Sequence, residues 1–154
     1  MANPDLKHVL NGLFEEATES FGMPEIRVRA ENLLAVVQRL KGELGFELFL
    51  DVTAIDHAER SPRFEVVYHF YSRLLNSRVR LKVPAPGSEP AVPTLTPLYG
   101  SARYMEREAH DMYGIVFTGN ADLRPILLYE GFVGHPLRKD YPMEAEQPIV
   151  DYRQ

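Results

Sequence analysis

Residues 63–83 decide how this chain folds, and they read RFEVVYHFYSRLLNSRVRLKV. Apolar and polar residues alternate over Arg63–Tyr71 and again over Arg78–Val83, which is the period of a β-strand with one buried face. Asn76 and Ser77 lie between the two runs and favour a turn. We therefore predict an antiparallel hairpin here.

The second strand of this hairpin carries a basic stripe, formed by Arg78, Arg80 and Lys82. We expect the stripe to lie on a solvent-facing side of the sheet, and an acidic partner is the alternative. Five prolines follow between residues 84 and 97. They exclude a helix or a central strand, so we expect a semi-rigid surface connection within one domain.

Two stretches before the hairpin have the period of an amphipathic helix. Over Leu6–Ser20 and Glu31–Leu44, apolar residues recur three or four positions apart, and glycines follow each stretch. We predict a short strand between them at Glu25–Ala30 and a longer one at Phe46–Ile55. The alternation in the longer strand places one apolar set together, namely Phe46, Leu48, Leu50 and Val52.

These elements predict an α+β fold of two layers, with the helices packed on one face of a mixed β-sheet. We place a single domain at residues 1–142, with a motif-rich segment at 101–142 and an extended acidic tail at 143–154, which we expect to be mobile. Of the 154 residues 45% are apolar, so the core needs no disulfide.

Composition excludes several classes of function. The net charge of −5 is unlike that of a nucleic-acid-binding protein. The chain has no cysteine, which excludes disulfides, thiol catalysis and thiolate ligation of zinc or iron–sulfur clusters. No run approaches the roughly 18 apolar residues that a membrane-spanning helix needs, so we expect no direct membrane span.

Residues 101–142 combine charges, aromatic residues, glycines and prolines at a density that predicts a shaped contact surface. We predict a helix at Ser101–Tyr113 that ends at Gly114. Arg107 and Asp111 have the i, i+4 spacing of an ion pair, worth about 0.3–0.5 kcal/mol when exposed. Helix stability alone therefore explains poorly why these charged residues occur together in this helix.

The same helix places Tyr104, Glu108 and Asp111 on one face. Two neighbouring carboxylates could serve acid–base catalysis or bind a metal, but the sequence shows no pocket and no further ligand beside them. Beyond the helix, we predict a short strand at Ile115–Phe117. Prolines at both ends of Pro136–Pro142 hold a basic run in a rigid shape, which is either an ordinary loop or an interface hot spot.

Three blocks of this segment carry a more specific signal than any short motif. They are EREAHDMYGI at Glu106–Ile115, DLRPIL at Asp122–Leu127 and GHPLRKDYP at Gly134–Pro142. In order and spacing they resemble the signature of the C subunit, the 30-kDa-type subunit, of respiratory NADH–quinone oxidoreductase (complex I). The chain departs from the family's pattern at Asn120, where the family often has a histidine.

The resemblance implies a subunit of the peripheral arm of complex I, on the cytoplasmic side of the cell inner membrane. It implies packing against the D subunit (the quinone-site subunit), which forms the quinone pocket with the B subunit, and contact with other hydrophilic-arm subunits. It further implies that this chain has no catalytic residue, metal or cofactor. Other subunits hold FMN and iron–sulfur clusters, and the whole complex couples electron transfer from NADH to quinone with proton translocation.

We accordingly predict that polar and aromatic side chains of this segment form a partner interface. The candidates are Tyr104, Arg107, Glu108, Asp111, Arg124, Arg138, Lys139, Asp140 and Tyr141. One alternative is the equivalent subunit of a membrane-bound hydrogenase, a plastoquinone-type oxidoreductase or an archaeal cofactor dehydrogenase. Another is a free-standing small enzyme that uses Glu108 and Asp111.

Overall fold

A five-stranded mixed sheet, in the order β1-β2-β5-β4-β3, forms one layer of the computed structural model, which describes residues 6–144 and 147. The strands are β1 (Glu16–Ser20), β2 (Met23–Arg27), β3 (Leu48–Asp56), β4 (Phe64–Ser72) and β5 (Ser77–Ala85). β2 and β5 run parallel, and the other neighbours run antiparallel. Most of the tail predicted at 143–154 lies outside the described residues.

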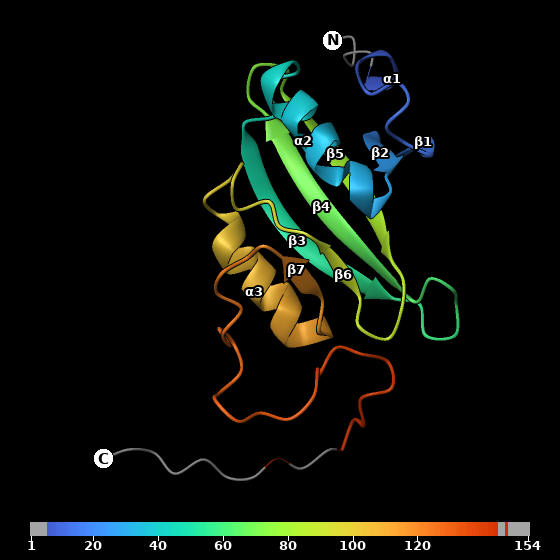
Figure 1. Ribbon diagram of the computed structural model, residues 1–154. Helices are drawn as coiled ribbons and strands as arrows, with labels where there is room; N and C mark the ends of the chain where they lie inside the picture. The colour runs from blue at the N-terminus through green and yellow to red at the C-terminus, as the bar shows by residue number, and fades with distance from the viewer. Residues whose placement is uncertain (1–5, 145–146, 148–154) are drawn as a thin grey trace.

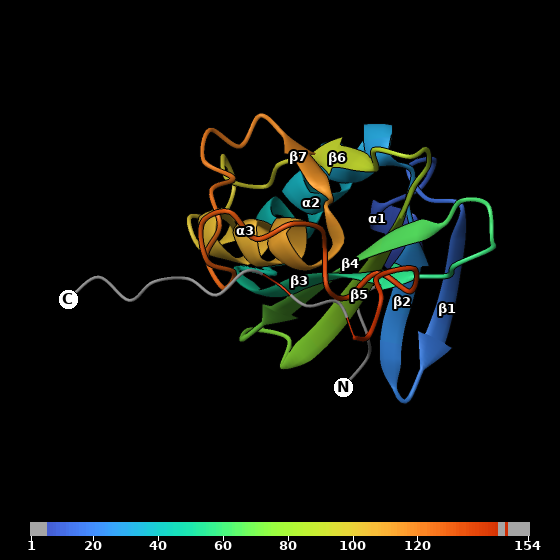
Figure 2. The same cartoon turned by 90° about the horizontal axis from the view of Figure 1, so that it is seen from below.

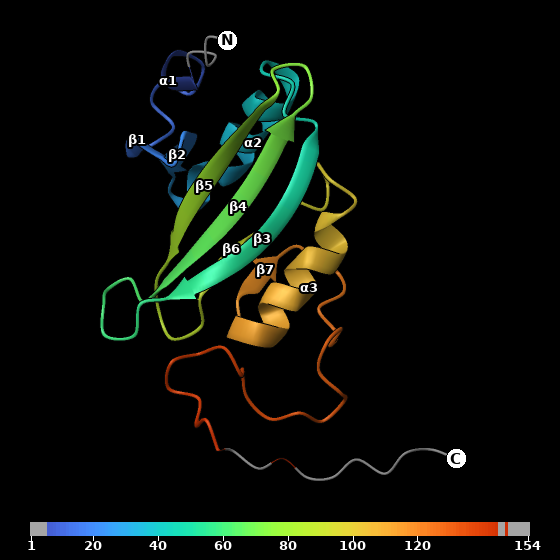
Figure 3. The ribbon, with the colours of Figure 1, turned by 180° about the vertical axis from the view of Figure 1, so that it is seen from behind.

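The second layer covers one face of this sheet (Figures 1 and 2). It consists of α2 (Leu33–Gly42), α3 (Ala102–Tyr113) and a small parallel pair of strands, β6 (Ala91–Pro93) and β7 (Val116–Thr118). A turn of 3₁₀ helix, η1 (Ala30–Asn32), leads into α2, and α1 (Leu6–Val9) lies near β1 and β2. Among the described residues no element covers the opposite face (Figure 3). The predicted two-layer α+β fold is confirmed.

The hairpin at residues 63–83 forms as its alternation predicts. Val66, Tyr68 and Phe70 of β4 are fully buried, and Val79 and Leu81 of β5 lie beside them in the core. The alternate residues point to the bare face, where those of β5 are half-buried or exposed, whereas Glu65 and Val67 of β4 remain buried. Side chains of both strands thus fill one core beneath α2 and α3, as expected for a sheet packed on one side.

The basic stripe lies on the bare face, as predicted, but part of it is neutralised within the chain. Glu25 of β2 pairs with Arg80 at 3.0 Å and with Lys82 at 2.6 Å. The parallel pairing of β2 with β5 places Glu25 opposite Arg80, which explains these contacts. No carboxylate among the described residues pairs with Arg78.

The predicted helix at Leu6–Ser20 is wrong beyond its first turn. The helix α1 covers only Leu6–Val9, and Glu16–Ser20 forms the edge strand β1. Gly22, which the sequence suggests as a helix end, instead completes the turn between β1 and β2, and its φ is +73°. Pairing with β2 outweighs the weak helical preference of this stretch, because strand formation depends on tertiary partners more than on local propensity.

Only part of the apolar set placed together at Phe46–Ile55 shares a face, because Phe46 and Val52 are buried whereas Leu48 and Leu50 are each 39% exposed. Phe49 pairs with Phe70 and Asp51 with His69, so Leu50 is an extra residue in a β-bulge. Because the side-chain period of a strand is two, one extra residue reverses which side chains face the core. Phe49 is therefore buried, whereas Leu50 is 39% exposed.

The proline-rich connection is more ordered than predicted. It contains β6, which pairs with β7 and buries Val92, and Leu95 beyond it is fully buried. β6 belongs to a separate two-stranded sheet, but β5, which lies between β2 and β4, continues through Pro84 and Ala85, so the exclusion of a central strand holds only beyond these two residues. Among the described residues, no helix is both long enough and apolar enough to span a bilayer.

Candidate partner interface

The helix α3 faces the core with small residues and with two buried acidic ones. Ala102 and Ala109 allow the helix to approach the sheet closely, and it lies beside β3 (Figure 1). Glu106 is fully buried and Asp111 is 4% exposed. Gly114 ends the helix in the left-handed conformation at φ +72°, as the sequence predicts.

Arg107 and Asp111 hold one loop instead of forming the predicted pair with each other. Arg107 donates to the carbonyl oxygens of Arg124 and Pro125, at 2.8 and 2.7 Å. The Asp111 Oδ2 atom accepts hydrogen bonds from the backbone N–H groups of residues 126, 127 and 128, at 2.8, 3.0 and 3.3 Å. The i, i+4 spacing thus places a cation beside successive carbonyls and an anion beside successive N–H groups.

The end of α3 holds the third signature block. Arg138 Nε donates to the carbonyl oxygen of Tyr113 at 2.6 Å, and His135 Nδ1 donates to that of Asp111 at 2.9 Å. A Cβ atom at Gly114 would lie 2.6 Å from His135 Nε2 and would also meet the Arg138 guanidinium. Only glycine leaves room for these two side chains, so the first and third blocks of the signature fit together at this residue.

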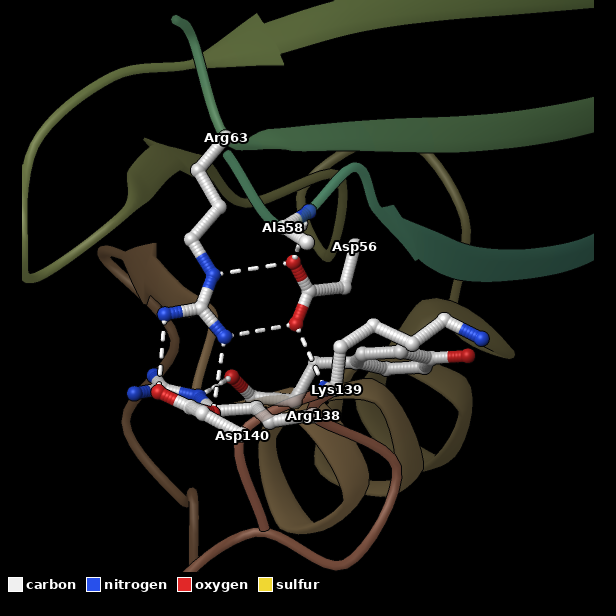
Figure 4. A network of polar contacts seen from close by, with 7 residues as sticks. Asp56, Ala58, Arg63, Arg138, Lys139 and Asp140 are labelled. Carbon is white, nitrogen blue, oxygen red and sulfur yellow. Dashed lines mark hydrogen bonds and ion pairs between the residues drawn. The ribbon is translucent and has the colours of Figure 1, made fainter. Parts of the chain in front are cut away.

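A second set of contacts joins the third block to the sheet. Arg63, immediately before β4, lies between Asp56 at the end of β3 and Asp140 (Figure 4). The Arg63 guanidinium donates to both oxygens of Asp56, at 2.8 and 2.7 Å, and to both oxygens of Asp140, at 2.9 and 2.8 Å. Asp56 also accepts a 2.8 Å hydrogen bond from the backbone N–H of Lys139.

The charges in this contact stabilise one another. Hydrogen bonds from Arg63 hold the pKa of Asp56 well below its usual range, with the N–H groups of Lys139 and Ala58 adding to the effect. The pKa of Asp140 is lowered by the same guanidinium. The Asp56 and Asp140 carboxylates raise the pKa of Arg63 in turn. The Arg63 and Arg138 guanidiniums also lie over the Phe64 ring, at 4.8 and 5.0 Å.

Glu106 is a carboxylate held by neutral donors. It accepts hydrogen bonds from the Thr94 hydroxyl at 2.6 Å, the Leu95 N–H at 2.7 Å and the Asn120 side-chain amide at 2.9 Å. Burial raises its pKa, and these hydrogen bonds offset part of that effect. Asn120, the departure from the family pattern, therefore connects the loop after β7 to α3.

The nine predicted interface residues fall into two groups by burial. Asp111 is buried, and Arg107, Arg138 and Tyr141 are half-buried, with Arg107 and Arg138 holding this chain's own backbone. Exposed side chains form the second group, namely Tyr104, Glu108, Arg124, Lys139 and Asp140. Arg124 also forms an ion pair with Asp122.

Sequence reasoning missed Asp56, Arg63, Glu106 and His135 as residues that hold the segment. The contacts of Asp56 and Arg63 join positions 77 to 83 residues apart, and no local pattern reports them. The exposed apolar side chains of the loop also escape the sequence patterns. Leu127 is 61%, Val133 71% and Leu137 49% exposed.

Comparison with known proteins identifies the family. Residues 26–147 match the family described as the respiratory-chain NADH dehydrogenase 30 Kd subunit. The chain belongs to this family. The match spans α2, α3 and all three signature blocks, so the predicted family is confirmed.

Relatives in this 30 Kd subunit family agree over most of the chain. The C 1 subunit of NADH-quinone oxidoreductase from Rhizobium meliloti (strain 1021) is 44% identical over 140 residues, which cover 90% of this chain and 69% of the relative. The C subunit of the same enzyme from Geotalea uraniireducens (strain Rf4) is 42% identical over 130 residues, which cover 84% of this chain and 79% of the relative.

Two solved structures share the fold of this 30 Kd subunit family member. A trypsin-resistant fragment of Nqo5 aligns with a TM-score of 0.65 at 31% identity, over 70% of this chain and 89% of the fragment. A chain of the membrane-bound sulfane sulfur reductase, an archaeal respiratory membrane complex, aligns with a TM-score of 0.79 at 27% identity. That alignment covers 90% of this chain and 84% of the other.

Proposed function

We propose that this chain is a non-catalytic, cofactor-free subunit of the peripheral arm of proton-translocating NADH:quinone oxidoreductase, on the cytoplasmic side of the membrane. Its residues 101–142 pack against the quinone-site subunit and support electron transfer from NADH to quinone. The relatives named as C subunits of that enzyme support this assignment. Among residues 6–144 and 147, no group of three or more histidine, aspartate or glutamate side chains is placed to hold a metal.

The observation that carries the proposal is how the charged signature residues are used. Arg107, Asp111 and Arg138 are committed to this chain's own backbone, and Arg63 is committed to Asp56 and Asp140. These contacts fix the loop, and the fixed loop presents apolar side chains outward. A rigid apolar surface with a polar rim is the form of a stable protein interface.

The free-standing enzyme that uses Glu108 and Asp111 fits this geometry poorly. One oxygen of Asp111 accepts three backbone N–H groups, and the residue is 4% exposed. Glu108 is exposed and does not line the small cavity of about 160 Å³ that Asp111 borders. The two carboxylates therefore do not share a pocket in which they could exchange a proton with a substrate.

A second candidate is the equivalent subunit of a related respiratory complex. The TM-score of 0.79 with a chain of the sulfane sulfur reductase favours it. The identity of 44% with a relative named as part of NADH-quinone oxidoreductase, against 27% with that chain, favours the first candidate. NADH- and flavin-binding subunits in the purified complex would separate the two.

The proposed interface is tested by charge substitution on its outer surface. Leu127→Asp and Val133→Asp, each made in a tagged full-length chain, should reduce recovery of the quinone-site subunit by about tenfold or more, because an interface would bury an unpaired charge. Leu74→Asp is the control, since Leu74 is 85% exposed at the β4–β5 turn. Recovery equal to that of the control would contradict the proposal.

Asp111 and Arg138, which hold the loop from its inner side, should act differently from the exposed Leu127 and Val133. Asp111→Ala and Arg138→Ala should also lower assembly with the quinone-site subunit, but by loosening the loop of the free chain. Limited proteolysis of these variants should therefore cut residues 123–141 faster, whereas Leu127→Asp should leave the rate unchanged. Full recovery of the quinone-site subunit with both inner variants would end the anchoring argument.

A further inference from the structure

The turn between β1 and β2 is unfavourable for the isolated chain. Phe21 and Gly22 occupy its two central positions, both with positive φ, at 51° and 73°. A turn of this kind favours Asn-Gly, because a bulky side chain strains the backbone at the first position. Phe21 is also fully exposed, so neither its backbone nor its side chain gains from packing within the chain.

A hollow of about 590 Å³ lies beside this turn on the bare face of the sheet. Phe21, Leu50 and Tyr71 supply apolar surface, and Arg78 and Arg80 supply positive charge. None of the described residues that line the hollow is acidic, although the chain as a whole carries a charge of −5. The hollow is therefore a local basic and aromatic site on an acidic protein.

The two arginines of the hollow are not equivalent. Arg80 donates to Glu25 at 3.0 Å and to His69 at 2.9 Å, so its guanidinium is already used. The Arg78 guanidinium forms no ion pair or hydrogen bond within residues 6–144 and 147. An incoming carboxylate would find Arg78 available beside the aromatic rings.

We propose that Phe21 and Arg78 form a docking site for an acidic segment of a partner protein that also carries an apolar side chain. A carboxylate of the segment pairs with Arg78, and the apolar side chain packs between Phe21, Leu50 and Tyr71. This contact explains why Phe21 is strained and exposed. A residue that lowers the stability of the free chain can still contribute to the free energy of binding a partner.

This site is separate from the interface proposed above. The turn at Phe21 lies at the end of the sheet where β5 begins, and Arg63 and Asp56 lie at the opposite end. Phe21 itself precedes residues 26–147, which match the family, whereas Leu50, Tyr71 and Arg78 lie within them. The docking proposal therefore does not depend on the packing of residues 101–142 against the quinone-site subunit.

A membrane surface fits the site less well than a protein. Binding to an anionic leaflet through charge takes a cluster of basic residues, about four to eight in typical polybasic segments. Among the described residues that line the hollow, Arg78 is the available cation, beside Phe21 and Tyr71, in a chain of net charge −5. One carboxylate with one apolar neighbour matches this arrangement better.

Photo-crosslinking in the native host tests the proposal. The full-length chain carries p-benzoylphenylalanine in place of Phe21, and cross-linked peptides are identified by mass spectrometry. We expect one protein segment with at least one Asp or Glu close to the cross-linked residue. Arg78→Glu should lower the yield several-fold, and Arg78→Gln should lower it less. The same probe in place of Glu59, at the far end of the sheet, is the control.

Lipid adducts, a segment without carboxylates, or a yield no higher than at Glu59 would overturn the proposal, as would a yield that Arg78→Glu leaves unchanged. The free chain provides an independent measurement. Phe21→Asn should raise its melting temperature, because Asn-Gly suits the turn and removes an exposed ring. A fall in melting temperature would show that Phe21 stabilises the free fold, and the proposal would fail.

Discussion

At the scale of single residues, the two buried carboxylates of α3 hold different parts of the chain although they lie on the same helix. Asp111 accepts three N–H groups of one loop, so it positions backbone. Glu106 accepts hydrogen bonds from Thr94, Leu95 and Asn120, and it ties α3 to the segments that follow β6 and β7. A buried acidic residue satisfied by hydrogen bonds in this way is structural, whereas the sequence suggests ion pairs and interface contacts for the carboxylates of this helix.

Tyr68 and Tyr99 make a matched pair for testing the core. The Tyr68 hydroxyl is buried and has no hydrogen-bond partner among the described residues, whereas the Tyr99 hydroxyl donates to the Phe46 carbonyl at 2.6 Å. Tyr68→Phe should leave the free energy of unfolding unchanged or raise it by up to about 1 kcal/mol, and Tyr99→Phe should lower it by about 1 kcal/mol. Urea unfolding measures both, and the reverse order would contradict this description of the core.

Asp56 and Asp140 share Arg63 but should differ in their effect on stability. The Asp56 side chain is 1% exposed and that of Asp140 is 64% exposed. Asp56→Asn removes the buried carboxylate that pairs with the Arg63 guanidinium. It should therefore lower the free energy of unfolding by about 3 kcal/mol. Asp140→Asn should cost less than about 1 kcal/mol, since solvent screens that pair. Equal effects in urea unfolding would show that the burial difference does not matter here.

The lowered pKa of Asp56 predicts how the stability of the fold changes in acid. The pKa of Asp56 is lower in the folded chain than its usual value near 4, so its contribution is present above that value and is lost as pH falls toward the folded pKa. Between about pH 5 and pH 3 the original chain should lose stability more steeply than Asp56→Asn. Unfolding curves at several pH values test this, and parallel pH profiles would refute the role of Asp56.

At the scale of elements, the accuracy of the sequence analysis follows the range of the interactions involved. The helix α3 and the β4–β5 hairpin are predictable because their alternation, turn residues and Gly114 act locally. The sequence predicts β1 as helix because its partner β2 is not visible in its own pattern. The apolar set predicted for β3 is divided between the two faces of the strand, because the bulge at Leu50 is set by pairing with β4.

Gly114 tests how α3 and the third signature block fit together. Gly114→Ala incurs the strain of a positive φ and also displaces Arg138 and His135, whereas Gly22→Ala, at nearly the same φ, meets no atom within 4 Å. Gly22→Ala should cost about 1–2 kcal/mol, and Gly114→Ala should cost at least about 1 kcal/mol more. Thermal unfolding compares them, and faster proteolysis of residues 129–141 should accompany Gly114→Ala alone. Equal losses would mean that the close approach at Gly114 is unimportant.

At the scale of the whole molecule, contacts over long sequence separations assemble the candidate interface. Arg63 reaches Asp140 across 77 residues, and Asp56 reaches the N–H of Lys139 across 83. The sequence blocks identify which segment matters and which family it resembles. They do not show that most charged residues hold the chain itself while Leu127 and Val133 point outward, because that division depends on burial in three dimensions.

Affinity purification of the tagged chain from its native membranes tests the central claim most directly. We predict a particle that contains the quinone-site subunit together with NADH- and flavin-binding subunits. This particle should reduce quinone with NADH, whereas the purified chain alone should neither oxidise NADH nor reduce quinone. Recovery of the chain as a free monomer that converts a small metabolite unaided would contradict the account.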